Sequence, residues 1–196
     1  MSSNWITQLL LILCLQMAVI AIARNDPTNY VEETIEAKDT HEKKPVLKKT
    51  RNNFDVSAYY RLTNAFKGSR LALDVDEQTN NYDLKLNPIS DRESQHWHFV
   101  PLGNGVYSLR TRSFGDEYSL DIINDGKNTI PHLAKTGQYT GQFWHLVRRS
   151  DGTYNMWNDF TTQDKLLGVI PSSGVAKMLP KAASEAKQRW RFVKIE

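Results

Sequence analysis

The chain has 196 residues, with 25 Lys or Arg and 22 Asp or Glu, a formal net charge of +3 and a pI near 8.9. This length is sufficient for one ordinary domain with a hydrophobic core and an additional segment. The basic excess is small and forms no block within residues 56–196, so the composition does not indicate a nucleic-acid-binding protein.

The N-terminal residues 1–23 have the pattern of a secretory signal peptide. Residues 9–23 are almost wholly apolar, no side chain in residues 1–23 is charged, and the segment ends in the small-x-small pattern of Ala21 to Ala23. A retained signal anchor is the alternative, although the apolar run is shorter than the roughly 20 residues that span a bilayer. We expect a secreted, extracellular protein without a stable membrane span after cleavage. Because the only cysteine, Cys14, lies in this segment, the mature chain would contain no disulfide bond.

Residues 24–55 are predicted to form a disordered charged arm. Apolar residues are sparse there and acidic residues precede basic ones, so the segment buries too little surface to offset its ordering entropy. It is interpreted either as a solvated spacer or as a pro-segment that is cleaved near Lys48, Lys49 or Arg51.

Residues 56–196 contain an internal repeat. A motif of Gln, any residue, Trp, a basic residue and a large apolar residue occurs three times, with its tryptophans 47 and 46 residues apart. These tryptophans are Trp97, Trp144 and Trp190. Two further motifs recur every 47 residues, and they begin at Tyr60, Tyr107 and Tyr154 and at Leu73, Leu120 and Leu167. A fixed period of this length is typical of a repeat architecture, with units at about residues 56–102, 103–149 and 150–196.

Each unit contains four short runs in which apolar and polar residues alternate, which is typical of half-buried β-strands. Turn sequences such as Asp125-Gly126 separate the runs, and no window has a sustained helical periodicity beyond one short turn within residues 181–187. Twelve short strands hide their edges best in a closed barrel. We therefore predict an all-β fold, a β-trefoil with a six-stranded barrel and three capping hairpins. Residues 191–195 are expected to pair near residues 59–60, and the periodic tryptophans are expected in the core.

The three Gln-x-Trp motifs, each late in a unit that also contains Leu-Asp-Val or a variant of it, resemble the ricin-B-type β-trefoil lectins. The resemblance covers residues 56–196. It implies one sugar site per unit, in which an aspartate after the second strand accepts hydrogen bonds from two sugar hydroxyls. It also implies an aromatic ring after the third strand, which stacks on the sugar, and a polar residue, often Asn, directly before the Gln.

This chain retains only part of the set that the resemblance implies. The aspartate is present in the first two units and replaced in the third: Asp74, Asp121 and Gly168. The stacking position is not aromatic in any unit: Asn87, Ala134 and Pro180. Three nearby residues are candidates to replace the ring: Tyr82, Tyr139 and His132. The residue before the glutamine is never Asn: Ser94, Gly141 and Lys187.

Two roles are open for the aspartates and the glutamines. Asp74 and Asp121 are expected either to bind a ligand or to cap a turn, since aspartate commonly accepts hydrogen bonds from nearby backbone N–H groups. The glutamine recurs even in the unit without the aspartate, which favours a buried amide that joins backbone groups over ligand contact. The candidate carbohydrate-binding residues are Asp74, Asp121, His132, Gln95 and Gln142.

No pattern of catalytic or metal-binding residues occurs in the sequence. It lacks His-Glu-x-x-His and Cys-x-x-Cys spacings, a phosphate-binding loop and a Gly-x-Ser-x-Gly motif. We expect a non-catalytic secreted lectin-like protein without a cofactor, whose partner is a glycan or glycoprotein. The alternative is a protein-interaction module, such as a protease inhibitor or a host-directed secreted factor, that binds through residues 76–83, 124–128 and 171–174.

Overall fold

The computed structural model describes residues 55–182 and 185–195. The predicted signal peptide lies outside these residues, as does the predicted charged arm except for Asp55. The described chain forms twelve β-strands and three short 3₁₀-helices, and it contains no α-helix.

Each unit contributes four strands and one 3₁₀-helix. The first unit contains β1 (Tyr59–Asn64), β2 (Leu71–Val75), β3 (Leu84–Pro88), η1 (Glu93–Gln95) and β4 (Trp97–Gly103). The second contains β5 (Val106–Thr111), β6 (Tyr118–Ile122), β7 (Pro131–Lys135), η2 (Thr140–Gln142) and β8 (Trp144–Arg148). The third contains β9 (Tyr154–Asn158), β10 (Lys165–Val169), β11 (Ala176–Pro180), η3 (Ala186–Gln188) and β12 (Trp190–Ile195).

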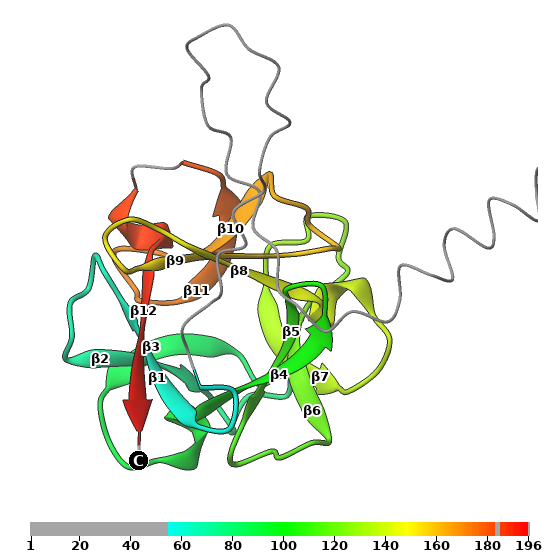
Figure 1. The fold of residues 1–196 in the computed structure, drawn as a ribbon, viewed down its shortest axis with the longest axis horizontal. Coiled ribbons are helices and arrows are strands. Elements are labelled where there is room, and N and C mark those ends of the chain that lie inside the picture. Colours follow the sequence, from blue (N-terminus) through cyan, green and yellow to red (C-terminus); the bar gives the residue numbers. More distant parts are fainter. Residues whose placement is uncertain (1–54, 183–184, 196) are drawn as a thin grey trace, which may run out of the picture.

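Six strands form a closed barrel, in the order β1, β4, β5, β8, β9 and β12, each antiparallel to the next. The ring closes where β12 pairs with β1 along its whole length, from Tyr59 opposite Ile195 to Asn64 opposite Trp190 (Figure 1). The predicted pairing of the C-terminal run with the first strand is therefore confirmed. Closure leaves none of these six strands with an unpaired edge along the ring.

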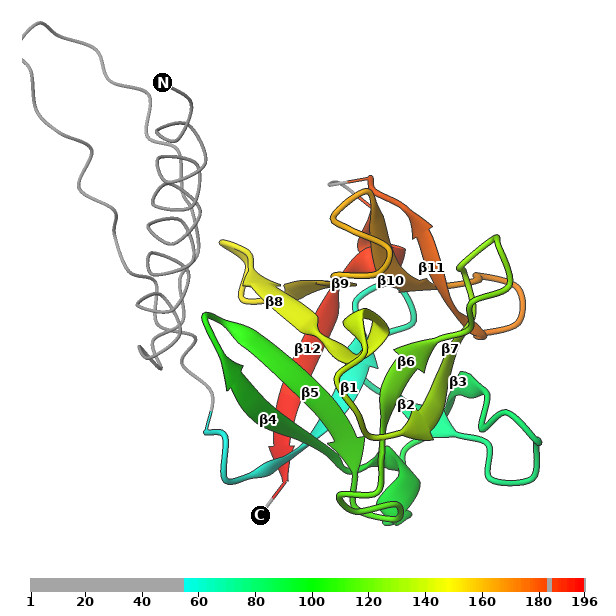
Figure 2. The same ribbon diagram turned by 90° about the vertical axis from the view of Figure 1, so that its right-hand side faces the viewer.

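The other six strands form three hairpins, β2–β3, β6–β7 and β10–β11, of which β2–β3 stays joined to the barrel through the pairing of Thr63 in β1 with Ala72 in β2. Figure 2 shows the three hairpins gathered at one end of the barrel. A six-stranded barrel with three hairpins at one end is a β-trefoil, which confirms the predicted fold class.

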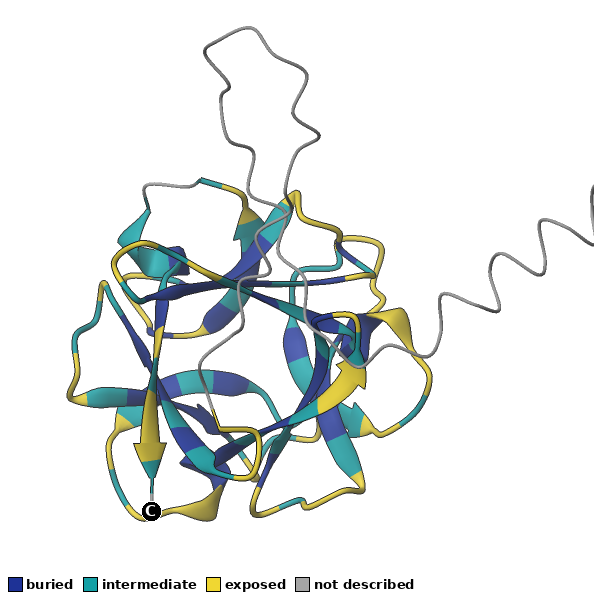
Figure 3. Ribbon diagram, viewed as in Figure 1, coloured by how far each residue is buried: buried dark blue, intermediate teal, exposed yellow. Residues whose placement is uncertain are grey.

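The periodic tryptophans join each hairpin to the barrel. Trp97, Trp144 and Trp190 begin the last strand of each unit and are fully buried. Each indole N–H donates to a backbone carbonyl in the second strand of the same unit, and the distances for Leu73, Leu120 and Leu167 are 2.9, 2.9 and 2.8 Å. Because a buried indole N–H requires an acceptor, this bond fixes the ring as well as filling the core. Figure 3 shows that the buried segments lie toward the centre, whereas the connecting loops are exposed.

Candidate functional site

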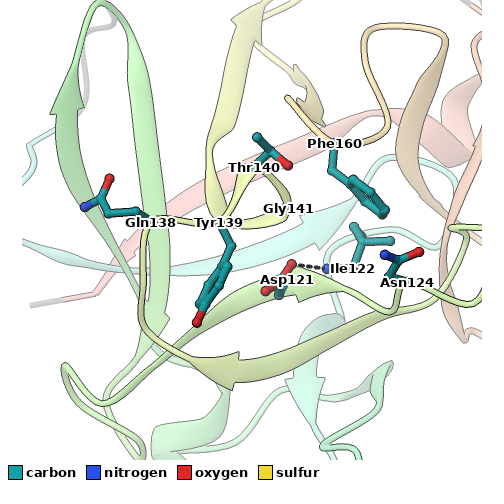
Figure 4. A pocket seen from close by; sticks show the side chains of 8 residues that line it. All are labelled: Asp121, Ile122, Asn124, Gln138, Tyr139, Thr140, Gly141 and Phe160. Atoms are coloured by element: carbon teal, nitrogen blue, oxygen red, sulfur yellow. Dashed lines mark hydrogen bonds between the residues drawn. The ribbon is translucent and has the colours of Figure 1, made fainter.

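A pocket of about 360 Å³ lies beside the second-unit hairpin β6–β7, within the volume range of about 300 to 1,000 Å³ that is usual for ligand sites. Its lining residues come from the end of β6 and the loop that follows it, from η2 and the two residues before it, and from the connection between β9 and β10. They include Asp121, Asn124, Tyr139, Thr140, Gly141 and Phe160 (Figure 4). Among the described residues that line the pocket, Asp121 is the only charged one.

Asp121 is held in place by two hydrogen bonds. Its Oδ1 accepts from the backbone N–H of Ile122 at 2.7 Å, and its Oδ2 accepts from Nε2 of Gln142 at 3.0 Å. The residue is partly exposed. Since a carboxylate has about four acceptor positions, Asp121 retains the capacity to accept hydrogen bonds from a ligand.

Two aromatic rings accompany this carboxylate in the pocket. Tyr139 is 60% exposed, whereas Phe160 is partly buried. In Figure 4 the two rings lie on opposite sides of Asp121. The backbone N–H of Phe160 donates to the carbonyl of Thr140 at 3.2 Å, which fixes the third-unit turn against the second unit.

The ring of Tyr139 lies over Gly137. A Cβ atom added to Gly137 would lie 2.3 Å from Cε2 of Tyr139, closer than non-bonded carbon atoms approach. Gly137 does not have a left-handed backbone, so a side chain there would conflict with the ring of Tyr139 and not with the backbone conformation. The spacing of Gly137 and Tyr139 therefore shapes one wall of the pocket.

The glutamine of each Gln-x-Trp motif performs the same structural task in all three units. Its Oε1 accepts from a backbone N–H in the loop after the third strand, at 3.1, 3.0 and 2.9 Å for Ser90, Gly137 and Ala182. Its Nε2 donates to a carbonyl at the end of that strand, at 3.0, 2.9 and 2.7 Å for Pro88, Lys135 and Pro180. In the first two units the same Nε2 also donates to the aspartate. Gln95 and Gln142 are buried, so the structure places them behind the aspartates.

Asp74 has a different environment from Asp121 although the two occupy equivalent positions. Asp74 is fully buried, and its Oδ2 accepts from Nδ2 of Asn87 at 2.9 Å and from Nε2 of Gln95 at 3.1 Å. The adjacent hollow is small, about 150 Å³, and is lined by polar and charged side chains around the Asp76–Lys85 ion pair, with Val75 as its apolar member. Asp74 is thus enclosed by side chains of its own unit.

Tyr82 does not accompany Asp74 as a ligand-facing ring. It has a left-handed backbone, with φ of 50°, and packs edge-on against Phe114 and Tyr118 at centroid distances of 4.8 and 5.6 Å. The aromatic cluster joins the first-unit loop to the second unit.

The third unit has no space for a carboxylate at the equivalent position. A Cβ atom on Gly168 would lie 2.9 Å from both Cδ1 of Leu179 and the carbonyl oxygen of Lys187. The glycine there is therefore enclosed by packing, whereas Asp121 borders a pocket with Tyr139 and Phe160 in its wall.

His132 lies directly across the hairpin from Asp121 and is partly buried. Burial lowers the pKa of His132 below its usual value near 6.5, while Asp121 and Asp83 act in the opposite direction. The imidazole is accordingly neutral at neutral pH. His132 is not among the residues that line the pocket.

Residues 55–182 and 185–195 lack two other kinds of feature. There, no group of three or more His, Cys, Asp or Glu side chains is placed to hold a metal ion. In the same residues, no helix has the length and apolar character needed to cross a bilayer.

Comparison with known proteins agrees with the fold and the repeat. Residues 50–139 match the family described as ricin-type beta-trefoil lectin domain-like. The designed three-fold symmetric protein ThreeFoil is 26% identical with a TM-score of 0.62, over 72% of this chain and 100% of ThreeFoil. The Macrolepiota procera ricin B-like lectin, solved with lactose, is 18% identical with a TM-score of 0.59, over 74% of this chain and 100% of the lectin.

Several similar structures are parts of larger proteins. The chain covers 17% of a mosquitocidal holotoxin and 33% of an endo-β-galactosidase from Clostridium perfringens, with TM-scores of 0.63 and 0.60 and 15% identity to each. Curated protein sequences provide no significant match. The six-stranded barrel, its three hairpins and the Gln-x-Trp repeats make this chain similar to the ricin-B-type β-trefoil modules. The expected resemblance of this chain to the ricin-B-type lectin family is confirmed.

Proposed function

We propose that the protein is a non-catalytic, lectin-like carbohydrate-binding protein whose binding site is the second-unit pocket. The observation that carries this proposal is the combination of a partly exposed carboxylate, Asp121, with two aromatic rings, Tyr139 and Phe160, in one pocket. A carboxylate accepts hydrogen bonds from sugar hydroxyls, and a flat ring covers the apolar C–H face of a sugar. The amide of Asn124 and the hydroxyl of Thr140 are further polar groups at the pocket wall.

The charge of the pocket favours a neutral sugar. Its described lining residues contribute one carboxylate and no cationic side chain. A sialylated or sulfated sugar would bring a second negative charge next to Asp121, which is unfavourable in a partly desolvated site. A neutral hexose or a short neutral glycan meets no such repulsion.

The affinity of one such site for a monosaccharide is expected to be low, in the millimolar to high-micromolar range, or about 4 to 6 kcal/mol. Strong attachment to a glycan-coated surface would then require several copies of the protein to bind together.

The test is a glycan array with the protein from Arg24 onward, displayed multivalently, beside the variant Asp121→Ala. We expect neutral glycans to bind the wild-type protein and the signal to fall at least tenfold in the variant, because the hydroxyl acceptor is lost. Asp91→Ala is the matched control, since Asp91 is a fully exposed carboxylate in the first unit, and it should bind as the wild type does. A blank array from a folded wild-type protein would contradict the proposal and would direct attention to protein partners of the loops.

We also propose that the protein is secreted, on the basis of the signal-like sequence of residues 1–23. Expression of the full chain in a eukaryotic cell line should yield a protein in the medium whose N-terminal sequence begins at Arg24. Retention of the intact N-terminus in the membrane fraction would favour a signal anchor.

A further inference from the structure

Gly141 stands directly before Gln142 and lines the second-unit pocket. A Cβ atom added to Gly141 would lie 1.9 Å from Oδ1 of Asp121 and 3.3 Å from the backbone nitrogen of Ile122. The first distance is far below any non-bonded contact. Gly141 is not one of the described glycines with a left-handed backbone, so its conformation is open to other residues. A side chain at this position would therefore displace the carboxylate of Asp121 from the place that it occupies.

The first unit shows the arrangement when this position carries a side chain. Ser94 is the equivalent of Gly141, and Ser94 and Asp74 are both buried. Nη1 of Arg92 lies 3.8 Å from Oδ2 of Asp74. Oδ1 of Asp121 accepts a hydrogen bond from the next backbone N–H, whereas Oδ1 of Asp74 has no hydrogen-bond partner among the described residues. The two carboxylates therefore differ in the hydrogen bonding of Oδ1, the atom of Asp121 that a Cβ on Gly141 would meet.

We propose that Gly141 is a positioning residue that opens the second-unit site. Its missing side chain allows the carboxylate of Asp121 to bond to the N–H of Ile122 at the pocket wall. The equivalent first-unit carboxylate, Asp74, instead lies beneath Asn87, Gln95 and the guanidinium of Arg92. The inference rests on the proposed function, because it assigns to Gly141 the presentation of Asp121 to the sugar.

The experiment compares Gly141→Ala with the wild-type protein in two measurements. The first is binding to the neutral glycans that the wild type recognises, which should weaken at least tenfold. The second is the amide resonance of Ile122 in a ¹H–¹⁵N NMR spectrum without ligand, which should move toward its position in Asp121→Ala because the bond to Oδ1 of Asp121 is displaced. Lys187→Ala is the matched control, since Lys187 is the equivalent residue in the third unit, and both measurements should remain unchanged.

A double variant addresses loss of folding. If Gly141→Ala lowers the melting temperature, the steric cause requires that the same substitution be much less harmful in an Asp121→Ala background, where the conflicting oxygen is absent. Equal destabilisation in both backgrounds would overturn the inference.

The two proposals fail in different ways. A wild-type protein that binds no glycan contradicts the proposed function, and the Ile122 resonance then decides whether Gly141 positions Asp121. Wild-type binding together with unchanged binding in Gly141→Ala overturns the inference alone. An unmoved Ile122 resonance overturns it in either case.

Discussion

Equivalent residues in the three units have taken different environments, and the aspartates illustrate this most directly. Asp74 bonds to Asn87 and Gln95 inside the protein, whereas Asp121 borders a pocket with Tyr139. The two share the Leu-Asp motif and the bond to the glutamine amide. Their difference arises from neighbours that do not belong to the repeated motif.

His96 is a second residue whose environment departs from that of its repeat equivalents. It is 5% exposed, and neither ring nitrogen has a hydrogen-bond partner among the described residues. Burial lowers the pKa of His96 below its usual value near 6.5, and the nearby Arg61 and Arg112 lower it further, against the opposing effect of Asp91 and Glu93. The folded protein consequently favours the neutral imidazole.

This shift predicts acid sensitivity of the fold. Below pH 6.5 the unfolded chain binds a proton at this histidine more readily than the folded chain does, so the free energy of unfolding falls as the pH falls from about 6.5 toward the folded-state pKa. The loss from this one group is at most about 1.4 kcal/mol per pH unit. The variant His96→Phe carries the residue that the second unit has at the same position, Phe143.

Urea unfolding at pH 7.5 and pH 5.5 measures the effect. The wild-type protein should lose more stability between the two pH values than His96→Phe, and His132 is present in both proteins, so its own titration cancels. An identical loss in the two proteins would show that His96 does not titrate in this range.

At the level of elements, each unit repeats one connection: third strand, loop, 3₁₀-helix and last strand. The loop sequences differ, yet the motif glutamine bonds to a loop N–H and to a carbonyl near the strand end in every unit. This explains why the Gln-x-Trp motif persists in the third unit, where Gly168 replaces the aspartate. The motif holds the same backbone connection in each unit, whereas the candidate ligand site depends on residues outside the motif.

The predicted short turn within residues 181–187 corresponds approximately to η3, Ala186–Gln188. The matching helices η1 and η2 were not predicted, because single turns of three residues have no hydrophobic periodicity. Strand β4 extends to Gly103, one residue beyond the predicted end of the first unit.

At the level of the whole molecule, the last strand completes the barrel by pairing with the first. Six residues of β12 pair with β1, and β12 also pairs with β9. The two ends of the domain therefore depend on one another, and contacts between residues so far apart in the sequence slow folding.

Truncation after Gln188 tests this dependence. Removal of β12 would expose the edges of β1 and β9 and delete the buried Trp190, a loss of about 3 to 5 kcal/mol for the tryptophan alone. We expect the truncated protein to aggregate and to lack a cooperative thermal transition, as measured by circular dichroism and size-exclusion chromatography. The wild-type protein purified in parallel is the control, and a monomeric truncated protein with a normal transition would contradict the role of β12.

The sequence by itself determined the fold, because the positions that recur every 46 or 47 residues are the ones that fill the core and tie each hairpin to the barrel. It also located Asp121 and named Tyr139 as a nearby ring. Only the tertiary structure decided which aspartate is exposed, because Asp74 is enclosed by Asn87, Gln95 and Arg92, whereas Asp121 borders the pocket. Phe160 escaped prediction because it reaches the second-unit pocket from the third unit. A repeat pattern describes each unit separately, and the pocket forms where two units meet.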